Sequence, residues 1–197
     1  ETRTDFLITI SSRLKKDLHS LQFKSLIDQR SLFTLLTDKK YQNLSVQIYD
    51  SKRNLIAWNY EPVLDEQGLN KTSSYINQSF FSSQKLFTHL CFADTLNSDK
   101  EVMLIVVSQP VEKHYSLSHK DDLTQNVADS LSNALSTKVE INYSPLAQFS
   151  KDGRKYSFAI QNNFSNKIAV ATFDKPSLEL EVNEIQKTIT IIQYLLL

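Results

Sequence analysis

The chain has 197 residues, of which 41% are hydrophobic and 22% charged, and its 22 basic and 22 acidic residues leave a formal net charge of zero. This composition is typical of a globular protein that is large enough to bury a core, and it excludes an intrinsically disordered chain. Basic residues adjoin one another only in pairs, so the sequence offers no phosphate-tracking patch and argues against nucleic-acid binding.

Glycine and cysteine are both scarce. Gly68 and Gly153 are the only glycines. Phosphate-cradling loops, dinucleotide-binding fingerprints and nucleophile elbows need glycine where the backbone adopts positive φ or approaches a ligand closely, so these enzyme classes are excluded. The single cysteine, Cys91, excludes an internal disulfide and a multi-cysteine zinc site. We therefore expect no cofactor and no metal.

The first 40 residues are expected to be helical. Apolar residues recur there at spacings of three and four, which predicts one apolar helix face: Leu7, Ile10, Leu14, Leu18 and Leu21. Leu7, Leu14 and Leu21 are also seven apart, which leaves two interpretations open. Either this face packs on the sheet of its own chain, or it forms a short coiled-coil seam for a homodimer. A weaker pattern over residues 23–36 predicts a second helix after a bend.

Strand signals begin after residue 40. Two apolar, β-rich runs at 44–49 and 55–58 flank a polar five-residue turn, which predicts a hairpin. Residues 61–68 are expected to form a loop, and residues 71–81 a short helix or turn-rich segment. Residues 86–93 then alternate as a strand does, with His89 and Cys91 on one face.

The second half of the chain continues this mixed pattern. Residues 102–107 are apolar at every position, which predicts a central strand covered on both faces. Leucine and valine spaced by fours predict a helix at 121–135. Three further strands are expected at 138–143, 155–161 and 167–173, the last two joined as a hairpin, and a helical pattern begins near residue 178.

Strands that cluster in hairpins predict antiparallel sheets with helices packed on one face, which is an α+β fold. We divide the chain into an N-terminal helix region (1–40), a main lobe (41–118), a second smaller α+β lobe (119–177) and an exit helix (178–197) expected to lead to a transmembrane segment. Whether the two groups of strands form one sheet or two is left open.

The order of elements and the first hairpin resemble the extracytoplasmic sensor domains, of the PAS-like or Cache type, of bacterial membrane histidine kinases. The matching hairpin residues are Ile48, Tyr49, Asp50, Leu55, Ala57 and Trp58. The resemblance implies a PAS-like sheet held between two helices that continue into the cytoplasmic membrane, with this domain on the periplasmic side. It also implies a non-enzymatic sensing role in two-component signal transduction, with a small molecule or a periplasmic protein as the partner.

Six residues are candidates for ligand binding. Trp58 and Tyr60 would form an aromatic wall over the sheet, and Arg53 in the preceding turn would reach an anionic group. The resemblance further implies that Tyr75, Phe81 and Phe87 line the pocket. The structural alternative is that the aromatic residues are core anchors and that Arg53 is solvated. The arginine-tryptophan-tyrosine-aspartate cluster of amino-acid-binding Cache modules is absent, so the ligand is left open.

Other chemical groups favour structural roles. His89 and Cys91 lie two residues apart in a strand, which is too far for a direct hydrogen bond, so we interpret them as a half-buried strand pair and not as an activated thiolate. His114 and His119 could join a metal site with Asp121 and Asp122. We interpret the two aspartates instead as ordinary residues at a helix N-terminus. The rival function is a secreted or lipid-anchored interaction or carrier module with no signalling role.

Overall fold

A computed structural model describes residues 3–22, 29–97, 102–114 and 126–175. In chain order the main lobe comprises α1 (Arg3–Gln22), α2 (Gln29–Leu36), the 3-10 turn η1 (Lys39–Tyr41), β1 (Ser45–Tyr49), β2 (Leu55–Trp58), α3 (Glu66–Lys71), η2 (Thr72–Tyr75), β3 (Ser79–Ser83), β4 (Phe87–Asn97) and β5 (Val102–Lys113). The smaller lobe comprises α4 (Val127–Leu135), β6 (Val139–Asn142), β7 (Lys155–Gln161) and β8 (Lys167–Asp174). None of the helices in these ranges is long and apolar enough to cross a membrane.

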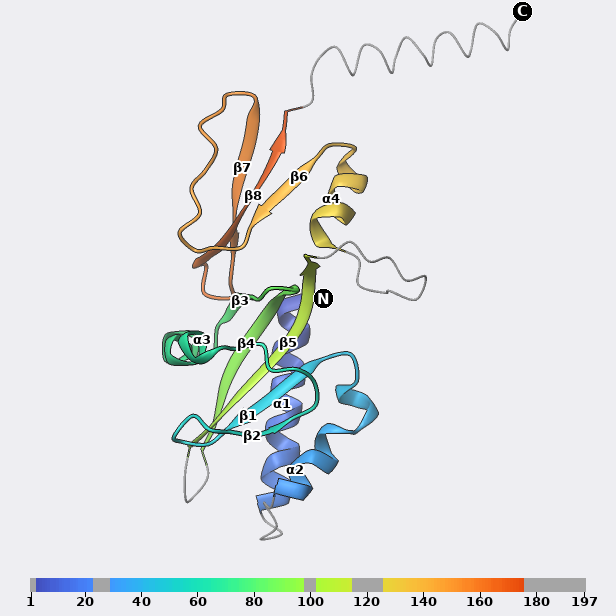
Figure 1. Cartoon of the computed structure of the whole chain (residues 1–197), viewed down its shortest axis with the longest axis vertical. Helices are drawn as coiled ribbons and strands as arrows, with labels where there is room; N and C mark the ends of the chain where they lie inside the picture. Colours follow the sequence, from blue (N-terminus) through green and yellow to red (C-terminus); the bar gives the residue numbers. More distant parts are fainter. Residues whose placement is uncertain (1–2, 23–28, 98–101, 115–125, 176–197) are drawn as a thin grey trace, which may run out of the picture.

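The two groups of strands form two separate antiparallel sheets, which answers the question that the sequence left open. The main sheet has the order β2-β1-β5-β4-β3, and the smaller one has the order β6-β8-β7. Figure 1 shows the smaller sheet beyond one end of the main sheet, so that the described part of the chain is elongated. The expected α+β class, with a long N-terminal helix and antiparallel sheets, is confirmed.

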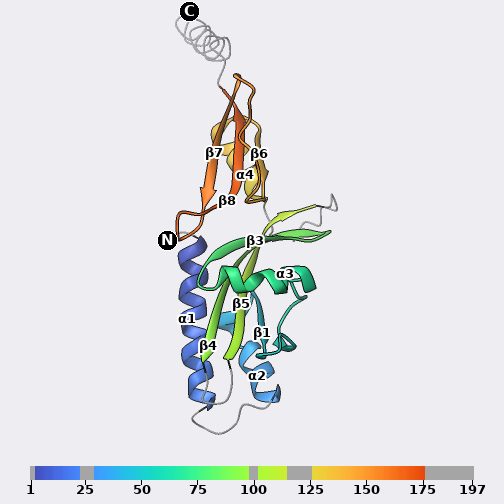
Figure 2. The same cartoon turned by 90° about the vertical axis from the view of Figure 1, so that its left-hand side faces the viewer.

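The main sheet is covered on both faces. On one face α1 and α2 pack against alternate residues of the central strands, among them Val46, Ile48, Phe92 and Ile105. On the other face lie Tyr49, Cys91, Ala93, Leu104 and Val106, covered by residues 63–64 and the region of α3 and η2. Figure 2 shows α1 and α3 on opposite sides of the sheet. This double cover explains why residues 103–107 are apolar without interruption.

The apolar face of α1 is buried in the core of its own lobe. Leu7, Leu14 and Leu18 are 0% exposed and belong to the main core cluster, and Leu21 packs against it half-buried. The interpretation in which this face packs on its own sheet is therefore the one that the structure shows. A homodimer through Leu7, Leu14 and Leu21 stays a prediction, and it would require the first two side chains, which have no exposed surface here, to leave the core.

Polar anchors fix α1 along the sheet. The buried carboxylate of Asp94 on β4 accepts hydrogen bonds from the Ser11 hydroxyl at 3.1 Å and from the Lys15 ammonium at 2.9 Å. Further along the helix, Asp17 accepts from the buried Tyr41 hydroxyl at 2.7 Å and pairs with Lys40 at 2.6 Å. These contacts are specific to position, so they hold the helix in one register on the sheet.

Several element boundaries differ from expectation. The expected turn-rich segment at 71–81 contains β3, an edge strand paired with β4, and the expected loop at 61–68 already enters α3 at Glu66. β4 and β5 run to Asn97 and Lys113, well past the expected ends. These long strands pair over almost their whole lengths, so tertiary pairing extended them through polar residues that carry a weak strand signal. The exit helix, His119 and the start of the helix expected at 121 lie outside the described residues.

Candidate functional site

An open pocket lies at the edge of the main sheet, where β5 runs past the start of β1. The last β1–β5 pair is Ser45 with Ser108, and the next β5 residues, Gln109 and Pro110, form part of the pocket wall. The pocket has a volume of about 1360 Å³. Its lining residues are Arg3, Asn43, Leu44, Ser45, Tyr60, Glu61, Asp65, Ser83, Gln84, Lys85, Leu86, Phe87, His89, Gln109 and Pro110.

Asn59 fixes the part of the pocket wall that contains Tyr60. The Asn59 carboxamide oxygen accepts from the Val46 N–H at 2.8 Å, and its Nδ2 donates to the carbonyl oxygens of Tyr41 and Leu44 at 3.1 and 2.9 Å. These bonds join the end of β2 to the segment that enters β1. Tyr60 follows directly and is 51% exposed, so its ring is offered to the pocket and not to the core.

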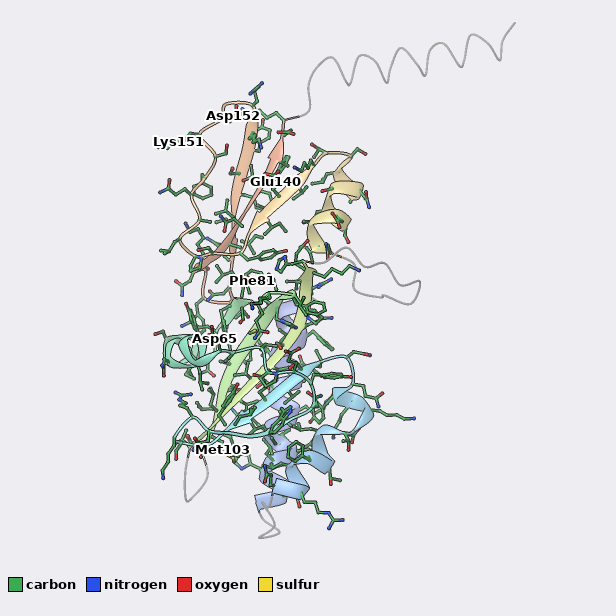
Figure 3. The ribbon with its side chains drawn as sticks, in the orientation of Figure 1. Asp65, Phe81, Met103, Glu140, Lys151 and Asp152 are labelled. Carbon is green, nitrogen blue, oxygen red and sulfur yellow. The ribbon has the colours of Figure 1, made fainter. Side chains whose placement is uncertain are left out.

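The loop after β2 is tied to β3 on the other side of the pocket. The Ser82 hydroxyl donates to the Val63 carbonyl at 2.6 Å, and the Gln84 carboxamide donates to the Pro62 carbonyl at 3.0 Å. Asp65 caps α3 by accepting from the Gly68 N–H at 2.7 Å, which places its carboxylate at the rim (Figure 3). The two sides of the rim are thus connected by hydrogen bonds through one loop.

A buried row of polar side chains leads from the sheet interior to the pocket. The Tyr49 hydroxyl donates to Gln47 Oε1 at 2.8 Å, and Gln47 Nε2 donates to Ser45 Oγ at 3.0 Å. Ser108 donates to the Ser45 carbonyl at 3.4 Å from the neighbouring strand. Gln47 and Ser108 are 0% exposed, and each has a hydrogen-bond partner, Gln47 in Tyr49 and Ser45 and Ser108 in the Ser45 carbonyl, which a buried polar group requires. The row gives the floor of the pocket a polar end at Ser45.

His89 is one of the titratable groups that line the pocket. It projects from the same sheet face as Cys91, since the two residues are two apart in β4, and it lines the pocket. Burial lowers its pKa, so the imidazole is neutral at neutral pH and can donate one hydrogen bond and accept another. Its Nδ1 is buried without a hydrogen-bond partner among the described residues.

The pocket carries charges of both signs. Arg3 and Lys85 contribute cations, and Glu61 and Asp65 contribute carboxylates. Between them lie the apolar surfaces of Leu44, Leu86 and Phe87 and the amides of other lining residues. Such a surface suits a small molecule with an apolar body and polar or charged ends.

Of the six residues that the sequence singled out, two line this pocket. Tyr60 and Phe87 contribute to its wall. Trp58 instead sets its ring edge-on against Phe33 of α2, with the centroids 5.2 Å apart, and is 38% exposed. Arg53 lies in the β1–β2 turn with φ at 68°, where Asp50 accepts hydrogen bonds from the turn amides.

The remaining two aromatic candidates pack inside the protein. Tyr75 stacks on Phe80, with the centroids 4.8 Å apart, over the second core cluster. Phe81 packs edge-on against Tyr143 of the smaller lobe, also at 4.8 Å. Sequence reasoning missed Asn59, Ser45 and Gln47. The polar residues at alternate positions of β1 were the available signal, because alternate residues of a strand share one face.

The groups that could suggest covalent chemistry are arranged for structure. Cys91 is 0% exposed, and burial raises the pKa of its thiol far above the usual range, so no thiolate forms at neutral pH. His114 Nε2 lies 2.9 Å from the Thr88 hydroxyl, which in turn lies 3.0 Å from Ser83 Oγ. The imidazole therefore meets a buried threonine and not an exposed nucleophile. Within the described residues no three metal-ligating side chains come together.

No known protein family, curated protein or solved structure matches this chain.

Proposed function

We propose that this chain is the extracytoplasmic sensing region of a bacterial membrane histidine kinase, of the PAS-like or Cache type. In this role it binds a small molecule or a periplasmic protein and passes the binding event to the cytoplasm through its terminal segments. The observation that carries the proposal is the open pocket of mixed polarity over a sheet that is braced by a long N-terminal helix. The role proposed for this pocket is binding, for which its mixed lining of apolar, polar and charged side chains is suited.

The order of the elements supports the same proposal. A long helix leads into a hairpin, and a central strand pair follows. The smaller sheet comes last, and the described residues end at Lys175. A protein of this kind works by population shift, because a ligand moves an equilibrium only by its differential affinity for two conformations. Shifts of about 1–2 Å at helix ends are sufficient to carry such a change.

Thermal unfolding in the presence of small-molecule collections tests the binding part. A ligand present at about 100 times its Kd stabilises the folded state by about 2.7 kcal/mol, which raises the Tm of a protein of this size by about 5–11 °C. Tyr60→Ala and Phe87→Ala should abolish the shift, whereas Phe164→Ala, which removes a comparably exposed ring outside the pocket, should keep it. A ligand whose effect survives both pocket variants would place binding elsewhere.

The encoding gene tests the signalling part. The proposal requires apolar spans of about 20 residues on both sides of the 197-residue chain and a kinase module downstream. A gene that encodes no such spans and no transmitter module would refute it.

A further inference from the structure

The two lobes are joined by the turn of the β7–β8 hairpin. Asn163 Nδ2 donates to the Asn77 carbonyl at 2.8 Å, and Asn163 Oδ1 accepts from the Ser79 N–H at 3.1 Å. Asn162 Nδ2 lies 3.2 Å from Gln78 Oε1 and 3.4 Å from the Ser79 carbonyl. A carboxamide that satisfies both a donor and an acceptor of the same segment fixes position as well as distance.

This turn is preorganised before it meets the main lobe. Asn162 Oδ1 accepts from the backbone N–H groups of Phe164 and Asn166 at 2.9 and 3.0 Å, so the side chain closes its own turn. Asn162 is only 8% exposed, although it lies in a hairpin turn. Burial of a turn asparagine with all its polar atoms paired indicates a rigid connection between the lobes.

The segment that receives the turn is the start of β3. Asn77 donates its N–H to the Ala93 carbonyl at 2.8 Å, which joins residues 76–79 to β4, the strand next to β3 in the main sheet. β3 then runs from Ser79 to Ser83, about 13 Å at 3.3 Å per residue. Its far end continues directly into Gln84 and Lys85 of the pocket rim. One short edge strand therefore touches the joint at one end and the pocket at the other.

A second contact between the lobes lies in the middle of the same strand. Phe81 packs against the Tyr143 ring, and the Tyr143 hydroxyl donates to Glu112 Oε2 on β5 at 2.7 Å. Figure 3 shows Phe81 at the junction of the two lobes. The smaller lobe thus contacts β3 both at its start, through Asn163, and in its middle, through Tyr143.

We propose that β3 is the coupling strand of the protein, and that the Asn162–Asn163 turn transmits occupancy of the pocket to the smaller lobe. β3 suits this role because it pairs on one side only and can shift on β4 more readily than a central strand can. The inference rests on the proposed sensing function for its purpose, but its test needs no natural ligand. The smaller lobe is the part of the described structure that immediately precedes residue 176, so it is the part through which a signal would leave.

A label attached covalently at the pocket tests the coupling between the pocket and the smaller lobe. Lys85→Cys places a reactive thiol at the pocket rim, and labelling it with fluorescein maleimide puts a bulky group of known structure at the pocket. Cys91 does not compete, because it is fully buried and its pKa is raised. Hydrogen exchange of residues 155–174, followed by mass spectrometry, should change at least threefold on labelling. The same label on Lys16→Cys, on the exposed face of α1, should leave residues 155–174 unchanged.

A second substitution, added to the labelled Lys85→Cys protein, tests whether the Asn163 hydrogen bonds carry the response. Asn163→Ala removes two hydrogen bonds to the main lobe and leaves the Asn162 turn intact, whereas Asn142→Ala removes an exposed carboxamide on β6 as a matched control. The response of residues 155–174 to the label should be lost in Asn163→Ala and kept in Asn142→Ala. The proposal is overturned if labelling at position 85 leaves residues 155–174 unchanged, or if Asn163→Ala transmits the change as well as the parent does. Failure of the sensing function would show instead in the gene or in the search for ligands.

Discussion

The buried ion pair between α1 and β4 allows a sharp test of what holds the N-terminal helix on its sheet. Asp94 is 6% exposed, and its carboxylate is paired with the Lys15 ammonium at 2.9 Å and the Ser11 hydroxyl at 3.1 Å. Lys15→Met keeps the aliphatic stem but leaves a buried carboxylate without its cation. Breaking a fully buried pair in this way costs about 3–5 kcal/mol.

The expected loss is smaller here, because one third of the Lys15 side chain reaches solvent. We expect Lys15→Met to lower the free energy of unfolding by about 2–3 kcal/mol, which is about 4–12 °C in Tm for a chain of this length. Combining it with Asp94→Leu should recover at least half of that loss, because no uncompensated charge then remains in the core.

Urea denaturation measures these differences, with Trp58 fluorescence as a probe within the main lobe and far-UV circular dichroism for the whole chain. Lys16→Met is the matched control: it removes a neighbouring but exposed lysine and should change the stability by less than about 0.5 kcal/mol. If Lys15→Met proves no more destabilising than Lys16→Met, the ion pair does not hold the helix and this reasoning is refuted.

Three further predictions follow from the same structure. Cys91 should not react with a thiol reagent at neutral pH in the folded protein and should react fully in concentrated guanidinium, since burial raises its pKa; prompt labelling of the folded state would contradict its burial. Burial raises the pKa of Tyr49 to about 12, so the stability it contributes is fully present below its unfolded pKa of about 10 and is lost as the pH rises through 12. Urea midpoints measured from about pH 9 to 12 should therefore fall less steeply in Tyr49→Phe, and identical slopes would argue against this contribution. Ser136 ends α4 with φ at 50°, so Ser136→Gly should raise the stability of the smaller lobe by about 0.5–1 kcal/mol in urea denaturation, whereas Ser136→Val should lower it.

The local spacing of apolar residues was sufficient to predict most of the helices and strands. The three-and-four spacing of leucines predicted α1, because the helix buries one repeating face, and the apolar runs around a polar turn predicted β1 and β2. The strands at 155–161 and 167–174 and the turn between them were predicted closely for the same reason. β3 was missed, since three of the five residues of Ser79–Ser83 are serines, which carry a weak strand signal, although the strand pairs with β4 across a short turn.

The pocket was less accessible to sequence reasoning. Tyr60 and Phe87, two of the predicted ligand-binding residues, line the candidate pocket together with residues 43–45, 83–86 and 109–110, which come from separate strands and turns. Trp58 is of a residue type that often contacts ligands, but its ring packs on Phe33 of α2. No periodicity reveals which aromatic residue a helix from elsewhere in the chain will cover.

The sequence by itself determined the α+β class, the N-terminal helix and the hairpins, because these depend on spacing and residue type within short windows. Only the tertiary structure decided that the strands form two sheets, that Leu7 and Leu14 are consumed by their own core, and that the Asn162–Asn163 turn joins the lobes. These features depend on side chains that meet from positions up to 88 residues apart, as Asn166 and Gln78 do. Such meetings are set by how the elements pack together, and no local pattern encodes them.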